Sequence, residues 1–146
     1  MEEIIKRNID KVYRAALAIT RSKPDAEDAV QNAFVKLIEK QPRFESREHE
    51  TAWLIRVAVN DCKNTLLFNK RSVGADLLDT YPAASPEQHD LVDAIGKLSA
   101  KYRLVIHLHY YEGYSTDEIA KITKQKPGTV REQLTRARRH LKEELS

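Results

Sequence analysis

Basic side chains are concentrated near the end of this 146-residue chain, where they could bind nucleic acid. Eight basic residues and one acidic residue, Glu132, lie between Lys121 and Lys142. In a helix starting near Pro127, an apolar stripe would occupy one side and the basic residues the other side and its flanks. Guanidinium groups contact phosphates and base edges, so this is a candidate DNA-binding surface. Its candidate residues are Thr129, Arg131, Glu132, Gln133, Thr135, Arg136, Arg138 and Arg139.

The residues before this basic helix are typical of a helix-turn-helix. Ser115 and Glu118 match the capping box that starts a helix, and Pro127 suits the first position of the next one. A three-residue turn, Lys124 to Lys126, separates the two predicted helices. A helix-turn-helix lays its second helix in the DNA major groove. A basic helix alone would favour the alternative of a solvated helix ending a bundle, but the capped helix and turn before it favour DNA binding.

A second candidate surface lies on a helix predicted from about residue 51 to residue 68. One broad side of it is apolar and includes Leu54, Ala58, Cys62 and Leu66. The other side carries Trp53, Arg56, Asn60, Lys63, Asn64 and Leu67. Single-stranded nucleic acid stacks its bases on aromatic rings while cations hold its backbone, and this strip could do both. Alternatively, Trp53 is a partly buried anchor that packs on the preceding helix.

A third candidate surface lies on the preceding helix, which is predicted to start at Pro24 and to end near Lys40, before Pro42. Its apolar stripe is expected to consist of Val30, Ala33, Phe34, Leu37 and Ile38. Its outward side is expected to carry Asp28, Gln31, Asn32, Val35 and Glu39. This acidic, amide-rich side could be merely solvated, or it could bind a protein partner with Val35 as the apolar contact.

Composition predicts an all-α protein, because glycine (4) and proline (5) are scarce and no stretch alternates with period two. Further helices are expected from Glu2 to Arg21, from about residue 86, and after Ser99.

Charge divides the chain into three parts. Residues 1–71 hold 14 basic and 11 acidic residues, residues 72–93 hold five acidic residues and no lysine or arginine, and residues 94–146 hold 11 basic and six acidic residues. Two basic blocks around an acidic linker suit two nucleic-acid contacts.

The sequence offers no candidate for catalysis, for a metal or for a cofactor. The single cysteine, Cys62, excludes an internal disulfide and a paired-cysteine site, and no two histidines have ligand spacing. Phosphate-binding glycine loops and nucleophile motifs are absent. The first residues contain no signal-peptide core, and no apolar run approaches about 20 residues. We therefore expect an intracellular, non-enzymatic protein.

Four sequence motifs along the chain belong together. The first is Ala-Glu-Asp-Ala-Val-Gln-Asn-Ala-Phe at 26–34, and the second is Ala-Trp-Leu-Ile-Arg-Val-Ala-Val-Asn at 52–60. The third is Asp-Glu-Ile-Ala at 117–120, and the fourth joins Gly-Thr-Val-Arg at 128–131 to Arg-Ala-Arg at 136–138. Together they resemble the bacterial RNA polymerase sigma factors of the sigma-70 family, specifically the small extracytoplasmic-function (ECF) group. The motifs occur in the family's order, and the resemblance covers nearly the whole chain apart from the linker.

The resemblance implies two small helical domains: a three-helix domain like sigma region 2 over residues 1–71, a linker over 72–88, and a helix-turn-helix domain like sigma region 4 over 89–146. Region 2 of the family binds the clamp helices of core RNA polymerase, and reads and opens the minus-10 promoter element. By position, the clamp-binding residues are Asp28, Gln31, Asn32 and Val35. The minus-10 residues are Trp53, Arg56, Asn60, Lys63, Asn64, Lys70 and Arg71.

Region 4 of the family reads the minus-35 element with its last helix, and its body contacts the polymerase flap. The resemblance also implies an anti-sigma partner, often membrane-anchored, so that the chain is expected in the cytoplasm and can be held at the membrane by that partner. Departures put the usual promoter sequence in doubt: the group often has Asp and Arg where this chain has Asn64 and Leu67, and Lys-Ser-Arg where it has Arg131, Glu132 and Gln133. Glu132 could accept from cytosine, and an outward Gln133 could pair with adenine.

These inferences predict an alternative sigma factor that binds core RNA polymerase and directs it to promoter DNA. One rival is a stand-alone DNA-binding regulator in which residues 1–71 serve dimerisation or sensing. The strip around Trp53 disfavours it, because a simple repressor has no use for a platform that binds unpaired bases. Another rival is a protein-binding helical adaptor, such as a sigma antagonist, which the basic charge near the C-terminus disfavours.

Overall fold

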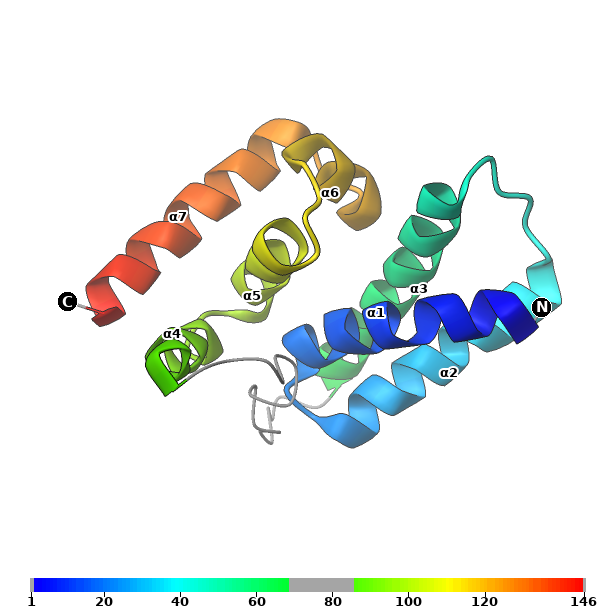
Figure 1. Cartoon of the computed structure of the whole chain (residues 1–146), viewed down its shortest axis with the longest axis horizontal. Helices are drawn as coiled ribbons and strands as arrows, with labels where there is room; N and C mark the ends of the chain where they lie inside the picture. The colour runs from blue at the N-terminus through cyan, green and yellow to red at the C-terminus, as the bar shows by residue number, and fades with distance from the viewer. Residues whose placement is uncertain (1, 69–85, 146) are drawn as a thin grey trace.

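A computed structural model describes the backbone of residues 2–68 and 86–145 and the side chains of residues 2–63 and 90–145. Its elements are α1 (Glu2–Thr20), α2 (Lys23–Lys40), α3 (Arg47–Phe68), α4 (Pro86–Gly96), α5 (Ala100–Ile106), the π-helical turn η2 (His107–Tyr111), α6 (Thr116–Thr123) and α7 (Pro127–Leu145) (Figure 1). All these elements are helical, which confirms the predicted all-α class. Most of the predicted linker, 72–88, lies outside the described residues, so the domain boundaries stay predictions.

Local side chains explain most helix ends. Ser22 starts α2 by accepting a hydrogen bond from the backbone N–H of Asp25, and the capping box of Ser115 and Glu118 starts α6 as predicted. Gly113, two residues after the end of η2, has φ +80°, a backbone conformation that glycine adopts without strain. Ser99 lies at the N-cap of α5, but its side chain makes no capping hydrogen bond.

Two boundaries differ from the sequence prediction. Helix α3 begins at Arg47 rather than near Thr51, because the Ser46 hydroxyl accepts from the His49 backbone N–H at 3.0 Å. That first turn is charged throughout, so no apolar period marks it. Helix α5 continues into η2, where the N–H of Glu112 reaches the carbonyl of His107, an extra residue per turn that apolar periodicity does not reveal.

Helices α1, α2 and α3 pack against one another, and α4, α5 and α6 pack against α7 (Figure 1). Both groups bury their apolar stripes, including Val130, Leu134 and Ala137 of α7.

Cys62 is fully buried, and burial raises the pKa of its thiol to about 12, as expected for a small reduced core residue. Ile38 is 51% exposed, so its assignment to the core of α2 was wrong. At 100° per residue, Ile38 lies about 100° from Leu37 and about 140° from Ala33, outside the stripe that these two residues define.

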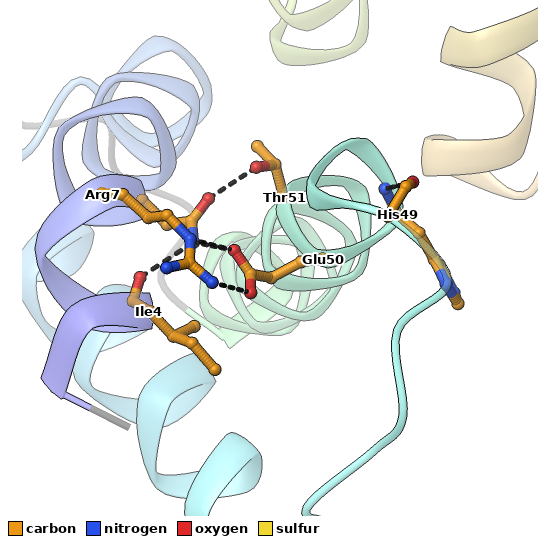
Figure 2. Close-up of polar contacts among 7 residues, drawn as sticks. Ile4, Arg7, His49, Glu50 and Thr51 are labelled. Carbon is orange, nitrogen blue, oxygen red and sulfur yellow. Dashed lines mark hydrogen bonds and ion pairs between the residues drawn. The ribbon is translucent and has the colours of Figure 1, made fainter.

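A buried polar network ties the start of α3 to α1 (Figure 2). Glu50, 4% exposed, accepts two hydrogen bonds from the Arg7 guanidinium, at 2.8 and 2.7 Å, and one from the Asn8 amide at 2.8 Å. The Asn8 amide also donates to the carbonyl of Ile4 and accepts from the Thr51 hydroxyl. Hydrogen bonding by Arg7 holds the pKa of Glu50 below its ordinary value. The network therefore keeps a carboxylate charged in a site that an unpaired charge could not occupy.

We predict that Glu50→Gln lowers the free energy of unfolding by about 1–3 kcal/mol, because it removes charge-assisted hydrogen bonds from a buried site. Urea unfolding at neutral pH measures the loss, and Glu48→Gln, on the same turn but exposed, is the matched control. Because the folded-state pKa of Glu50 is lowered, its contribution is complete above the unfolded carboxyl pKa and is lost as the pH falls through the folded value. The free energies of unfolding of the wild-type protein and Glu50→Gln should therefore converge in acid. Equal losses from both substitutions would contradict the role of this network.

Candidate nucleic-acid interface

The basic side of α7 faces solvent. Its apolar residues are buried against α5 and α6, which turns the opposite side outward. Seven of the eight predicted DNA-contacting residues are exposed: Thr129, Arg131, Glu132, Thr135, Arg136, Arg138 and Arg139. Helix α6 packs on α7, and Lys124 between them adopts the left-handed conformation, with φ 56°, that closes α6. The chain thus holds a cationic helix surface in a helix-turn-helix, as the sequence predicted.

Gln133, the eighth residue, is half-buried and turned toward the turn before α7. Its amide N–H donates to the Gln125 side-chain oxygen at 2.8 Å, and the Gln125 amide donates back at 3.2 Å. The Gln125 amide also reaches the Thr123 hydroxyl at 2.9 Å. A base contact by Gln133 stays a prediction, and it requires breaking this paired amide. The sequence analysis did not identify Gln125, because the only sign of it in the sequence is a second glutamine eight residues before Gln133.

Partners within α7 and beneath it orient the exposed arginines. Glu132 and Arg136 are one helical turn apart and form an ion pair, with 2.7 Å between a carboxylate oxygen and a guanidinium nitrogen. Each side chain therefore already has a partner before it contacts a base. Hydrogen bonding by Tyr102 and the charge of Glu132 raise the pKa of Arg136. The Nε of Arg138 donates to the Tyr110 hydroxyl, and its guanidinium lies 5.4 Å from the centre of that ring. The sequence reasoning missed both tyrosines, because no spacing rule connects α5 and η2 to α7.

The strip on α3 is only partly open to solvent. Trp53 is half-buried, and its ring meets Phe44 edge-on with centroids 5.8 Å apart. The anchoring alternative is therefore partly correct, although Phe44 lies in the connection before α3 and not in α2. Arg56 is half-buried, and Asn60 and Lys63 are exposed. The side chains of Asn64 and Leu67, and residues Lys70 and Arg71 as a whole, lie outside the described residues.

A groove of about 620 Å³ separates α3 from α6. Ala52, Trp53 and Arg56 line its α3 side, and Tyr114, Glu118, Lys121 and Ile122 line the other; Glu45, Glu48 and His49 complete its lining. The groove holds charges of both signs. The Trp53 end of the candidate single-strand surface of α3 therefore faces the helix-turn-helix across this groove.

The outward side of α2 carries the four residues predicted to bind a protein partner. Asp28, Gln31, Asn32 and Val35 are all exposed, and Val35 shows 49% of its surface. Ile38, 51% exposed, extends this side by one turn and adds a second apolar contact. The Asn32 amide lies 3.2 Å from both carboxylate oxygens of Asp61 on α3, which fixes its orientation. A polar surface with two adjacent apolar side chains is typical of a protein-binding site.

Two classes of site are absent from the part of the chain that the structure describes. No group of three histidine, cysteine or carboxylate residues is placed to hold a metal ion there. Among the same residues, no helix combines the length and apolarity needed to cross a membrane.

Comparison with known proteins adds family matches at both ends of the chain. The model of Sigma-70 region 2 matches residues 4–72, and that of Sigma-70, region 4 matches residues 88–141. The RNA polymerase sigma-E factor of Streptomyces avermitilis is 30% identical, with 99% of this chain and 84% of the relative aligned. The ECF RNA polymerase sigma factor SigE of Mycolicibacterium smegmatis is 27% identical over 99% of this chain, which spans 61% of that relative's length.

Solved structures share the same arrangement of helices. The sigma factor RpoE from Bartonella quintana, in complex with the anti-sigma factor NepR, matches with a TM-score of 0.77 and 25% identity over 99% of this chain and 95% of that one. CnrH, in complex with the cytosolic domain of CnrY, has the same fold, with a TM-score of 0.71 and 24% identity over 99% and 86%. Together with the two family models in order and the Streptomyces relative, these matches confirm the sequence prediction: the chain belongs to the sigma-70 family of RNA polymerase sigma factors, in its ECF group.

Proposed function

We propose that this chain is an alternative sigma factor that binds core RNA polymerase, directs it to promoters with minus-35 and minus-10 elements, and assists their opening. It is a transcription initiation factor and not an enzyme. The observation that carries the proposal is the exposed cationic side of α7, held outward by a capped helix-turn-helix in a chain of the sigma-70 family. The proposed domains are residues 1–71 and 89–146, joined by residues 72–88.

The minus-35 contact is assigned to α7. Its arginines can neutralise phosphates, so the logarithm of the binding constant should fall by about 0.9 per logarithmic unit of salt for each phosphate contacted. An arginine that pairs with a base edge would add about 1–3 kcal/mol of discrimination. The Glu132–Arg136 pair couples an acceptor to a donor at adjacent positions, which favours a site with a cytosine next to a guanine or phosphate.

Removing two of these arginines tests the assignment. We predict that Arg136→Ala with Arg139→Ala lowers promoter-dependent run-off transcription at least about tenfold, because each side chain is worth about 1–3 kcal/mol if it contacts a base. Binding to core polymerase should be unchanged. The matched control is Lys97→Ala with Lys101→Ala, which removes the same charge from exposed positions outside α7. Full transcription by the arginine variant would refute the assignment.

The polymerase contact is assigned to the outward side of α2. The exposed pair Val35 and Ile38 supports it, because isolated apolar side chains on a polar side suit a protein partner better than a phosphate backbone. This contact also separates the proposal from a stand-alone regulator, which would bind DNA without polymerase. Co-purification of the chain with core polymerase distinguishes the two.

The minus-10 contact is assigned to Trp53 and the basic strip of α3. We predict that Trp53→Ala impairs promoter opening more than closed-complex formation, since unpaired bases lose a stacking surface worth about 1–3 kcal/mol per base. Permanganate reactivity of the opened thymines measures opening, and a gel-shift assay measures closed complexes. Because Trp53 also packs on Phe44, the control is Trp53→Phe, which keeps an aromatic ring and should retain most opening. Full reactivity of the alanine variant would exclude this role.

An anti-sigma partner also forms part of the proposal. The structural relative RpoE from Bartonella quintana was solved with the anti-sigma factor NepR, which supports a similar inhibitor for this chain. The proposed location is the bacterial cytoplasm, with retention at the membrane when the inhibitor is membrane-anchored. Co-expression with the product of an adjacent reading frame, followed by co-purification, tests this pairing.

A further inference from the structure

We propose that reciprocal arginine contacts between α1 and the α4–α5 corner latch the chain in a closed state. In this state α6 partly covers the Trp53 end of the minus-10 surface of α3, while the minus-35 surface of α7 stays open. The role of the α3 surface in binding the minus-10 element rests on the proposed function, whereas the latch itself rests on side-chain geometry alone. The latch is defined by Arg14, Arg21 and Arg103, which reach across from one helix group to the other.

Arg103 is the central contact. It lies on α5 and is 6% exposed, and its Nε donates to the carbonyl of Ala18 at 2.7 Å. Its other two nitrogens donate to the carbonyls of Ile19 and Leu98. Ala18 and Ile19 belong to the last turn of α1, where carbonyls have no partner within the helix and carry the negative end of its dipole. A residue about 85 positions away in the chain thus completes the end of the first helix.

Arg21 makes the reciprocal contact. It follows α1, and its guanidinium donates at 2.9 Å to the carbonyl of Gly96, the last residue of α4. Each helix group therefore supplies an arginine that caps a helix end of the other group. The two guanidinium groups are close enough that Arg21 and, more strongly, burial lower the pKa of Arg103, to about 10. Arg103 is still charged at neutral pH, so the contacts have to outweigh repulsion as well as desolvation.

A third contact lies further along α1. Arg14 is 3.6 Å from the Glu112 carboxylate and 5.4 Å from the centre of the Tyr111 ring. His107, fully buried, stacks on Tyr111 and lies 3.8 Å from Glu112. Burial and the nearby Arg14 charge lower the pKa of His107 to about 3, so it is neutral and does not repel Arg14. Buried apolar side chains of both helix groups belong to one continuous cluster, so these charged contacts add to an apolar contact between the groups.

The latch determines which surfaces DNA can reach. With α1 joined to α5, α6 lies opposite α3, and Trp53 and Arg56 line the groove between them. Trp53 and Arg56 are thus partly covered by α6, whereas Asn60 and Lys63 of the same strip stay exposed. The predicted minus-35 residues of α7 other than Gln133 are exposed in the same state. In the closed protein α7 is therefore open to duplex DNA, while α6 limits the access of an unpaired base to the Trp53 ring until the groups separate.

Trp53 makes this state measurable, because it is the only tryptophan of the chain and lies in the covered groove. The experiment compares acrylamide quenching of its fluorescence in the free full-length protein, in Arg103→Met, and in Lys101→Met, an exposed control on the same helix. Methionine keeps the apolar stem while removing the donors. We expect quenching to increase at least about twofold in Arg103→Met alone, because the open state becomes populated. Circular dichroism verifies that helix content is kept.

Binding of fluorescein-labelled dT12 provides the second readout. If the closed state predominates by about tenfold, opening should tighten oligonucleotide binding by about the same factor. Should Arg103→Met lose helix content, Arg21→Ala, which opens the latch from the half-exposed side, decides the question with the same measurements. A folded variant with unchanged Trp53 quenching overturns the latch. Increased quenching without tighter dT12 binding upholds the latch and instead counts against the minus-10 assignment of Trp53.

Discussion

Every helix end leaves backbone groups without partners, and the described part of this chain is a series of helices with many such ends. Their caps come from two ranges. Ser22, Ser46 and Ser115 cap helices from within their own turns, so these starts form independently of the rest of the chain. The end of α1 is completed by Arg103, which can reach it only when the two helix groups are packed together. Local caps define the helices, and the remote cap defines their arrangement.

The division between apolar and basic sides has a similar effect on α7. Only Val130, Leu134 and Ala137 of this helix are buried, a stripe narrow enough to leave most of its circumference in solvent. The arginines then lie outward because the core has no room for them, and tyrosines of the underlying helix hold two of them in place. The presentation of charge on α7 thus depends on packing on its opposite side.

The sequence predicted features whose cause lies within about one helical turn. The capping box of Ser115 and Glu118, Pro127 at the start of α7 and the buried stripe of α7 were identifiable for that reason. The prediction placed the start of α3 late, because the turn that Ser46 caps has no apolar residue to mark it. Ile38 was misplaced because it lies about 40° beyond Phe34, just outside the buried stripe, although it is apolar.

Contacts that join distant residues had no signal in the sequence. The amide pair of Gln125 and Gln133, the tyrosines under α7 and the contacts of Arg103 depend on which helices pack together, and polar residues show no periodicity that reveals a partner. The candidate surfaces were therefore predicted as lists of side chains. Their mutual orientation, above all that of α3 toward α6, required the three-dimensional structure.

The Gln125–Gln133 pair also bears on attempts to build synthetic gene circuits from this chain. Randomising α7 to change its promoter preference would, at Gln133, also remove the hydrogen bonds that hold the preceding turn. A change in base preference could then not be distinguished from a less ordered turn. The exposed residues Glu132 and Thr135 do not form this contact with Gln125, so they are better starting points for an orthogonal regulator.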